Sequence, residues 1–490
     1  MKIALPKLAS TLRKLPFFVS AGLMVATIQP GTASELPELG QDAAAIISPY
    51  QERQIGEEAM AQIRQSLDFV DDPELTYYLQ HLGAKLTNAL PDRPSGYQFF
   101  LVANPTINAF ALPGGFIGVH TGLVAKARSE SELAAVLAHE ISHVTQRHWP
   151  RLVAAQNDRA GVTLAAILAS IVIAGSGNPN GAGVAIAAMA ANTDSQLVFT
   201  RSFEREADRI GIRLLADSGY DVSAMAGFFE RLAEDNRLGG VNVPEFMRTH
   251  PVTSSRIAEA RGSERRFPQN GTKSSDAFWH FRARTLALYE PDSAQVIANF
   301  RNELSNSKIE AGRRLATRYG IALAFTKQGD YGLARKEISA LRIRQPKKLR
   351  YRLAEADIEL GAANIKKGLA LYHHIYKANS RNSWVIQRYA EVLLANNRAL
   401  TAVKILKPAL QQDPRNSTLN KLLATAAGET GDLIQAHRSM AEYYVINGNP
   451  HAAINQLNIA EKKARDNFYA LAAIKARKRE IENLLPKSAN

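Results

Sequence analysis

A 34-residue repeat in the second half of the chain constrains the fold more than any other feature of the sequence. Two sets of small residues keep this interval: Ala334, Gly368, Ala402 and Ala436, and an earlier set formed by Ala322, Ala356, Ala390 and Ala424. The interval is that of the tetratricopeptide repeat, in which small side chains let two paired helices approach closely. We therefore expect an α-solenoid with repeats at 315–348, 349–382, 383–416 and 417–450.

The turns between the expected helices keep the same phase. They fall at Gly329-Asp330, Ala363-Asn364, Asn397-Arg398 and Gly431-Asp432. Near the end the phase slips by half a repeat, because Gly448 follows Gly431 at half the usual interval. One helix at about 433–446 is therefore expected to serve two helix pairs. Residues 280–312 have a helical pattern but match the repeat poorly, so we interpret them as an N-terminal cap.

The length of 490 residues suits two domains. Loop-forming residues gather between Phe267 and Ser275, so we place the boundary around 265–280. We expect a zincin-like, mainly helical domain with a small β-sheet over 35–270. A tetratricopeptide solenoid should follow over 280–490, which makes the fold mainly α.

The segment 1–34 reads as a cleavable signal peptide. A basic start that includes Lys2 and Arg13 precedes a short apolar core at 15–28, and small residues follow at 31–34. An uncleaved anchor is the alternative. The chain contains no cysteine, so a metal site must use nitrogen and oxygen ligands. We expect export to the periplasm of a Gram-negative bacterium.

Charge is divided unevenly along the chain. Residues 301–490 hold 33 basic and 16 acidic residues, whereas residues 35–300 hold 23 and 30. A basic solenoid favours acidic protein segments or an anionic membrane surface as partners, although the charge could equally serve solubility alone. The sequence contains no nucleic-acid-binding motif, and we expect no nucleic-acid partner.

The stretch His139-Glu140-Ile141-Ser142-His143 indicates a metal site with a catalytic base. The preceding residues, 131–138, are strongly helical, so both imidazoles project from one helix face and can share a metal ion. Glu140 lies one step around the helix, where a carboxylate can take a proton from the attacking water. The alternative is a helix with two histidines and a glutamate that have no metal role.

A catalytic zinc site needs three protein ligands. Residues 203–208 read FEREAD, and Glu204 and Asp208 share one helical face. We assign Glu204 to the metal and Asp208 to a role beside it, where it orients a ligand histidine or assists proton transfer. Glu206 points elsewhere. A solvated charged face is the alternative for all three carboxylates.

The order of these motifs resembles a known family. NAFALPGGFIGVHTGL at 108–123, HEISHVTQRH, FEREAD, and Thr249-His250-Pro251 followed by Arg256 are similar to the HtpX-like zinc metallopeptidases, which include the CAAX prenyl proteases. A soluble periplasmic branch of that family also carries a C-terminal repeat array. The motifs cover about 50–265, and the repeats extend the likeness to nearly the whole chain.

The resemblance implies specific roles. His139, His143 and Glu204 would bind one zinc ion, Glu140 would be the base, and Asp208 matches the family's ExxxD aspartate. It also implies quality control of outer-membrane β-barrel proteins. The enzyme would assist their assembly, degrade unfolded or stalled chains, and reach the β-barrel assembly machinery through its repeats. The competing class is a non-enzymatic tetratricopeptide chaperone or adaptor with a structural zinc site.

A predicted strand, two further histidines and two apolar runs also lead to expectations. Pro113-Gly114-Gly115 predicts a turn before a strand at 116–121, whose backbone edge could pair with an extended substrate. His120 and His148 are interpreted as structural histidines, the latter at a helix end. Apolar runs at 162–174 and 183–191 are too short to span a bilayer, so we expect packing on the peptidase core or peripheral membrane contact.

His250 lies in a loop-like stretch stiffened by Pro251. The family match at Thr249-His250-Pro251 favours an active-site role. The imidazole could donate a hydrogen bond to the oxyanion, or it could occupy the open position of the zinc and hold the enzyme inactive. We favour the switch over the oxyanion role, and a purely structural histidine is the third reading.

Overall fold

A computed structural model describes residues 47–93, 96–157, 193–238, 244–267 and 271–483. The predicted signal peptide at 1–34 and the two apolar runs at 162–174 and 183–191 lie outside these residues. Among the described helices, none has the length and apolar composition needed to cross a membrane.

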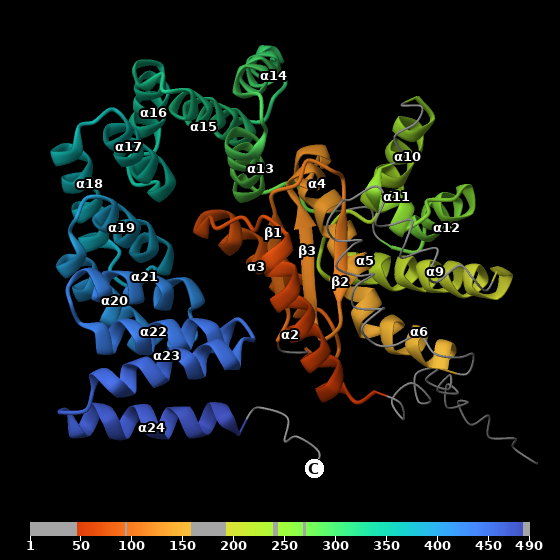
Figure 1. Ribbon diagram of the computed structural model, residues 1–490. Helices are drawn as coiled ribbons and strands as arrows, with labels where there is room; N and C mark the ends of the chain where they lie inside the picture. Colours follow the sequence, from red (N-terminus) through yellow and green to blue (C-terminus); the bar gives the residue numbers. More distant parts are fainter. Residues whose placement is uncertain (1–46, 94–95, 158–192, 239–243, 268–270, 484–490) are drawn as a thin grey trace, which may run out of the picture. The chain divides into compact units, whose positions relative to one another are not determined.

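The first half of the chain combines helices with a three-stranded sheet (Figure 1). Its elements are α2 (Pro49–Ser66), α3 (Pro73–Thr87), β1 (Gln98–Val102), β2 (Ala109–Leu112), β3 (Phe116–His120), α4 (Thr121–Lys126), α5 (Glu130–Thr145), α6 (His148–Asn157), α9 (Thr193–Asp217), α10 (Ser223–Leu238), α11 (Glu245–Thr249) and α12 (Ser254–Glu264). The expectation of a mainly helical fold with a small sheet is confirmed.

The strand order is β1-β3-β2, with β1 parallel and β2 antiparallel to β3. The predicted strand at 116–121 is therefore present but central, and both of its edges are already paired. The hypothesis that this strand offers its edge to a substrate is wrong. Among the described residues, no strand pairs with the outer edge of β2, whereas Phe69 bridges the far side of β1 at Val102.

Helix α5, which carries the HExxH motif, is buried along most of its length. Ser129 caps its N-terminus by accepting a hydrogen bond from the Glu132 amide, and acidic residues in the first turn complement the helix dipole. Helix α9 packs closely on α5 because Gly211 lacks a side chain. A Cβ atom there would lie 3.2 Å from the backbone nitrogen of His139.

The second half consists of consecutive helices, coloured green to blue in Figure 1. They are α13 (Asp276–Tyr289), α14 (Ser293–Ser305), α15 (Ala311–Gln328), α16 (Tyr331–Arg344), α17 (Leu349–Gly361), α18 (Ile365–Ala378), α19 (Ser383–Ala395), α20 (Ala399–Gln412), α21 (Ser417–Glu429), α22 (Leu433–Ile446), α23 (Pro450–Lys463) and α24 (Phe468–Glu482). The predicted array of helix pairs is confirmed.

Backbone conformation marks the repeat interval. The turns after α15, α17, α19, α21 and α22 each contain one residue with positive φ: Gly329, Ala363, Asn397, Gly431 and Gly448. The first four are spaced by one full repeat, and the last follows after half a repeat. Helix α22 packs against both α21 and α23, so the prediction that a helix at 433–446 serves two helix pairs is confirmed.

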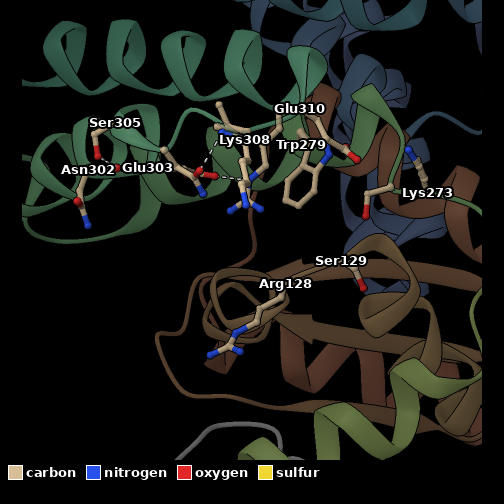
Figure 2. Close-up of a pocket in the computed structure, with 13 residues that line it drawn as sticks. Arg128, Ser129, Lys273, Trp279, Asn302, Glu303, Ser305, Lys308 and Glu310 are labelled. Carbon is tan, nitrogen blue, oxygen red and sulfur yellow. Dashed lines mark hydrogen bonds and ion pairs between the residues drawn. The ribbon is translucent and has the colours of Figure 1, made fainter.

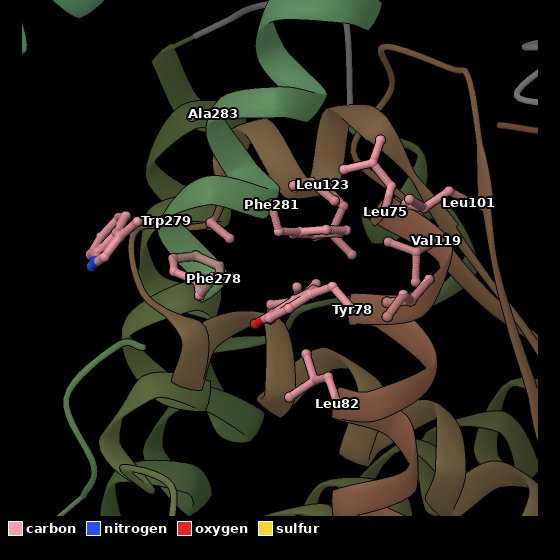
Figure 3. Packing of buried hydrophobic residues seen from close by; sticks show 14 of the residues in the cluster. Leu75, Tyr78, Leu82, Leu101, Val119, Leu123, Phe278, Trp279, Phe281 and Ala283 are labelled. Carbon is pink, nitrogen blue, oxygen red and sulfur yellow. The ribbon is translucent and has the colours of Figure 1, made fainter. Parts of the chain in front are cut away.

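Helix α13 does more than cap the N-terminal end of the array, which was our interpretation of 280–312. It packs against α3 and α4 as well as against α15. Its Phe278 and Phe281 are buried near Tyr78 and Leu123 (Figure 3), and one hydrophobic cluster continues from the sheet into α17. The division at 270–280 therefore stays a prediction, since the two regions share a core.

A buried histidine in this shared core predicts a pH-dependent stability. The Nδ1–H group of His280 donates to the Asp276 carbonyl at 2.6 Å, and its Nε2 lies 2.7 Å from the Tyr351 hydroxyl. Burial, with a smaller effect of Arg350, lowers the pKa of His280 to about 3. The unfolded chain binds this proton near pH 6.5, so the contribution to stability is complete above that pH and is lost as the pH falls toward 3.

We expect His280 to account for about 2 kcal/mol of destabilisation between pH 7.5 and pH 5. Urea unfolding of the wild type and of His280→Gln, with a chelator present, measures it. The variant should lose this part of the pH dependence, because all other titrating groups are common to both proteins. An equal pH dependence in the two proteins would contradict the assignment.

Candidate metal centre

Four side chains from three segments meet between α5 and α9. His139 and His143 come from α5, Glu204 comes from α9, and His250 follows α11. One nitrogen or oxygen atom of each lies within 4.8 Å of the others, and the group could hold a metal ion. All are buried except His143, which is half-buried. The residues that the sequence assigned to one metal are thus brought together.

The separations within this cluster suit tetrahedral coordination. Nε2 of His139 lies 3.0 Å from Nε2 of His143 and 3.3 Å from both Oε2 of Glu204 and Nδ1 of His250. Oε1 of Glu204 lies 3.0 Å from Nδ1 of His250 and 3.5 Å from Nε2 of His143. A tetrahedron with metal–ligand bonds of about 2.0–2.1 Å has edges of about 3.3 Å. The donor set and its spacing therefore fit a divalent metal.

The outer nitrogen of His139 faces the second carboxylate of α9. Nδ1 of His139 lies 3.0 Å from Oδ1 of Asp208, as the sequence predicted for a carboxylate that orients a ligand histidine. Arg256 donates two hydrogen bonds to the Asp208 carboxylate, at 2.7 and 2.8 Å. Nη1 of Arg256 also lies 2.9 Å from Oε2 of Glu204, so one guanidinium contacts both carboxylates. Apart from its place in the motif order, nothing in the sequence indicated this role of Arg256.

The outer nitrogen of His143 meets His148, which the sequence placed away from the site. The two Nδ1 atoms are 2.8 Å apart, and Nε2 of His148 lies 3.2 Å from Oε2 of Glu206. The prediction assumed that α5 continues as a helix through His148, in which case this side chain would point away from His143. The helix instead ends at Thr145, and Arg147 with φ of 52° turns the chain back toward His143. His148 is therefore more than a helix-end packing residue, which corrects that interpretation.

Glu140 is buried beside the cluster, with 1% of its surface exposed. Its Oε1 has no hydrogen-bond partner among the described residues and lies 3.5 Å from Nε2 of His250. A carboxylate in this state is available to accept a proton from a molecule that enters the site.

A short helix fixes the position of His250. Helix α11 begins where the Phe246 amide donates to the Ile107 carbonyl at 3.0 Å, next to β2. The His250 amide donates back to the Phe246 carbonyl at 2.7 Å, and the two rings stack 4.9 Å apart. Phe246 is fully buried. The imidazole is therefore presented to the cluster by an anchored segment.

Electrostatics at the cluster favour a cation. Burial by itself would lower the pKa of His139, but Asp208 and Glu204 raise that pKa to about 10. Burial by itself would raise the pKa of Glu204, yet His250 and His139 hold it well below its usual value. Burial lowers the pKa of His148 to about 4, so that imidazole is neutral near pH 7. The two carboxylates therefore stabilise positive charge between them, which a divalent metal would supply.

Two other features lie apart from the cluster. His120 is buried in β3, its Nδ1 atom lies 2.8 Å from the Thr106 hydroxyl, and it contributes no atom to the cluster. These contacts agree with our interpretation of His120 as a structural histidine. A pocket of about 620 Å³ lies near the start of α5, and its lining includes Arg128, Lys273, Trp279 and Glu303 (Figure 2). None of the described residues that line it is a histidine, so it is separate from the metal centre.

Comparison with known proteins assigns the fold and site to a family. The model of peptidase family M48 matches residues 73–264. The β-barrel assembly-enhancing protease of Escherichia coli (strain K12) is 31% identical over 469 residues, which cover 95% of each chain. The chain belongs to peptidase family M48. It is a metalloprotease, and the matched segment of this M48 peptidase contains all four residues of the metal centre.

Further relatives of this M48 peptidase fall into two groups. The putative β-barrel assembly-enhancing protease of Vibrio cholerae is 32% identical over 420 residues, or 86% of each chain. The mitochondrial metalloendopeptidase OMA1 of Schizosaccharomyces pombe is 32% identical over 162 residues, or 33% of this chain and 44% of the relative. The match to the bacterial relatives therefore extends into the sequence of the helical array, whereas the match to the mitochondrial one covers a segment about the size of the peptidase region.

Proposed function

We propose that this M48 peptidase is a periplasmic zinc metalloendopeptidase that promotes the assembly of outer-membrane β-barrel proteins and degrades misassembled ones. The observation that carries the enzymatic part is the convergence of His139, His143 and Glu204 on one possible metal position beside the buried Glu140, whose Oε1 accepts no hydrogen bond from the described residues. A structural site needs no base, which argues against the non-enzymatic adaptor. Likeness over 95% of the chain to a β-barrel assembly-enhancing protease supports the substrate class.

In this proposal His139, His143 and Glu204 are the zinc ligands, with one zinc ion per chain. Bound there, zinc supplies the Lewis acid that polarises the scissile carbonyl and the attacking water. Glu140 accepts the proton of that water and delivers it to the leaving amine. Asp208 holds the proton of His139 Nδ1, which leaves the Nε2 lone pair directed to the metal.

The substrate strand is proposed to lie along β2. Helix α5 packs directly against this strand, and the outer edge of β2 is unpaired among the described residues. An extended chain that adds to this edge gains backbone hydrogen bonds that do not depend on its sequence. Such pairing suits an unfolded β-barrel protein, whose segments are prone to form strands.

The position of His250 supports the switch rather than the oxyanion role. Its Nδ1 atom is 3.0–3.3 Å from Glu204 and His139, at the fourth corner of the coordination tetrahedron. Its Nε2 atom faces Glu140 at 3.5 Å. A ring in this place excludes water from the metal and engages the base, so the enzyme would remain inactive until the α11 segment moves.

Replacing His250 by alanine should therefore raise cleavage of an unfolded β-barrel protein by roughly tenfold or more, since the competent form is then no longer a minor one. Zinc content should stay at one per chain, because three ligands remain. Gel-based cleavage rates and metal analysis measure both. Thr249→Ala is the matched control in the same segment. A fall in rate with normal zinc would favour the oxyanion role, and an unchanged rate would leave a structural one.

Docking to the assembly machinery is proposed for the helical array, which is rich in basic residues. Removing residues 280–490 would not test this cleanly, because the deletion would expose the surface of α3 and α4 that α13 covers. Substitutions that leave the chain intact are needed instead.

The proposed function is tested by Glu204→Ala in the full-length His250→Ala protein, in which the proposed switch is absent. We expect this double variant to lose zinc and cleavage of an unfolded outer-membrane β-barrel protein together, because only His139 and His143 remain as ligands. Glu234→Ala, at an exposed position of α10, is the control and should keep both. Full zinc content in this double variant would remove Glu204 from the site. A His250→Ala protein that neither binds zinc nor cleaves would refute the function.

A further inference from the structure

The two histidines of α5 are anchored in different ways. Each presents Nε2 to the cluster and Nδ1 to a partner behind it. The partner of His139 is a carboxylate, Asp208, which can only accept a proton. The partner of His143 is another imidazole, His148, which can accept or donate depending on its tautomer. The function of His143 therefore depends on which nitrogen of His148 carries the proton.

We propose that His148 is a positioning residue that accepts a hydrogen bond from the Nδ1–H group of His143 and so holds the Nε2 lone pair of His143 toward the metal. This inference rests on the proposed function, because it takes His143 as a zinc ligand. It adds Glu206 to the site as the carboxylate that sets the tautomer of His148.

Only one arrangement of protons satisfies all three groups. If His143 gives its Nε2 lone pair to the metal, its proton is on Nδ1, and Nδ1 of His148 must accept it across 2.8 Å. The proton of His148 is then on Nε2, where Glu206 accepts it at 3.2 Å. The opposite tautomer would turn the Nε2 lone pair of His148 toward the Glu206 carboxylate and the Nε2–H of His143 toward the metal. Both contacts would be repulsive.

Packing holds this relay in place. His148 is 4% exposed and stacks on Phe203, with ring centres 4.3 Å apart and planes at 14°. Arg151 also lies over the Phe203 ring, at 4.5 Å from its centre, and contacts Glu206 at 2.9 Å. Phe203, Glu204 and Glu206 belong to one turn of α9. The turn that brings Glu204 to the cluster therefore also fixes the support of His143.

The sequence FEREAD thus carries three separate contributions to one centre. Glu204 faces the cluster, Asp208 holds His139, and Glu206 holds His143 through His148. Partners of this kind commonly change metal affinity by about 10–100-fold when they are removed. The expected effect of His148 is therefore on metal binding, with loss of activity as a consequence.

Three full-length variants test the proposal with Zn²⁺ and Co²⁺ alone as probes. His148→Leu removes the acceptor and is expected to weaken Zn²⁺ binding, measured by competition with a chelator, by about 10–100-fold. It should also change the visible absorption of bound Co²⁺. His148→Asn places an amide oxygen near the position of Nδ1 and should recover most of the affinity. His120→Leu, which removes a buried histidine outside the cluster, should leave both readouts unchanged.

The outcomes separate this inference from the function on which it rests. Zn²⁺ affinity and a Co²⁺ spectrum in His148→Leu equal to those of the wild type would overturn the role of His148 alone. Equal weakening in His148→Asn and His148→Leu would also overturn it, since the loss would then come from packing. Absence of Zn²⁺ binding by the wild type would refute the proposed function as well. If His148→Leu does not fold, Glu206→Ala at a half-buried site should weaken binding by about tenfold, and unaltered binding there would be contradictory.

Discussion

Replacing Glu140 by glutamine is expected to lower kcat/KM for peptide hydrolysis by about 10³-fold, the effect of losing a general base. Glutamine has the same shape but cannot accept the proton of the attacking water. The side chain is buried and its Oε1 atom has no hydrogen-bond partner among the described residues, so the substitution breaks no existing hydrogen bond of that atom. Zinc content and folding should therefore be those of the parent protein.

The measurement is best made in the His250→Ala background, where the proposed switch no longer masks the rate. Glu234→Gln, an exposed carboxylate of α10, is the matched control. Activity within tenfold of the parent would show that Glu140 is not the base. The same Glu140→Gln protein separates the two parts of the function. Assembly of β-barrel proteins should partly survive it, because binding a client does not require hydrolysis.

The second large effect concerns the junction between the peptidase core and the helical array. Asp72 caps α3 by accepting from the amides of Glu74 and Leu75 at 3.1 Å, and its other oxygen contacts Arg284 of α13 at 2.7 and 2.9 Å. Both side chains of the ion pair are 8% exposed. Burial by itself would raise the pKa of Asp72, but Arg284 lowers it, so the carboxylate is ionised near pH 7.

Asp72→Asn should destabilise the protein by about 3 kcal/mol, because it removes the nearer of the two carboxylates that face the buried Arg284 guanidinium and leaves only Glu74, at 3.5 Å. Asp72→Ala removes the helix cap as well and should cost about 1 kcal/mol more. Urea unfolding of the metal-free proteins, followed by tryptophan fluorescence, reports on this region through Trp279 of α13. Glu230→Gln breaks a half-exposed pair with Arg261 and should change stability by less than about 1 kcal/mol. Equal effects at Asp72 and Glu230 would exclude a buried-charge penalty.

Local patterns in the sequence were sufficient for the helical array. Its repeat interval depends on residues at fixed turns, and Gly329, Asn397 and Gly431 adopt positive φ where the pattern placed turns. The half-repeat slip could be predicted for the same reason, since Gly448 repeats the conformation of Gly431. Helical spacing likewise predicted that His139 and His143 would point to one place, because two residues four apart share a helix face.

Tertiary structure decided what these patterns left open. Strand order is set by which edges the chain pairs, and this made β3 central and left β2 as the open edge. His148 lies against His143 because α5 ends at Thr145 and the chain turns at Arg147. Helical periodicity in the sequence does not predict this turn. The sequence by itself determined which side chains occupy each helix face and where the repeats turn. Contacts between distant segments, such as Asp72 with Arg284 or His148 with Glu206, required the folded chain, because burial and hydrogen-bond partners depend on how elements pack and not on their local spacing.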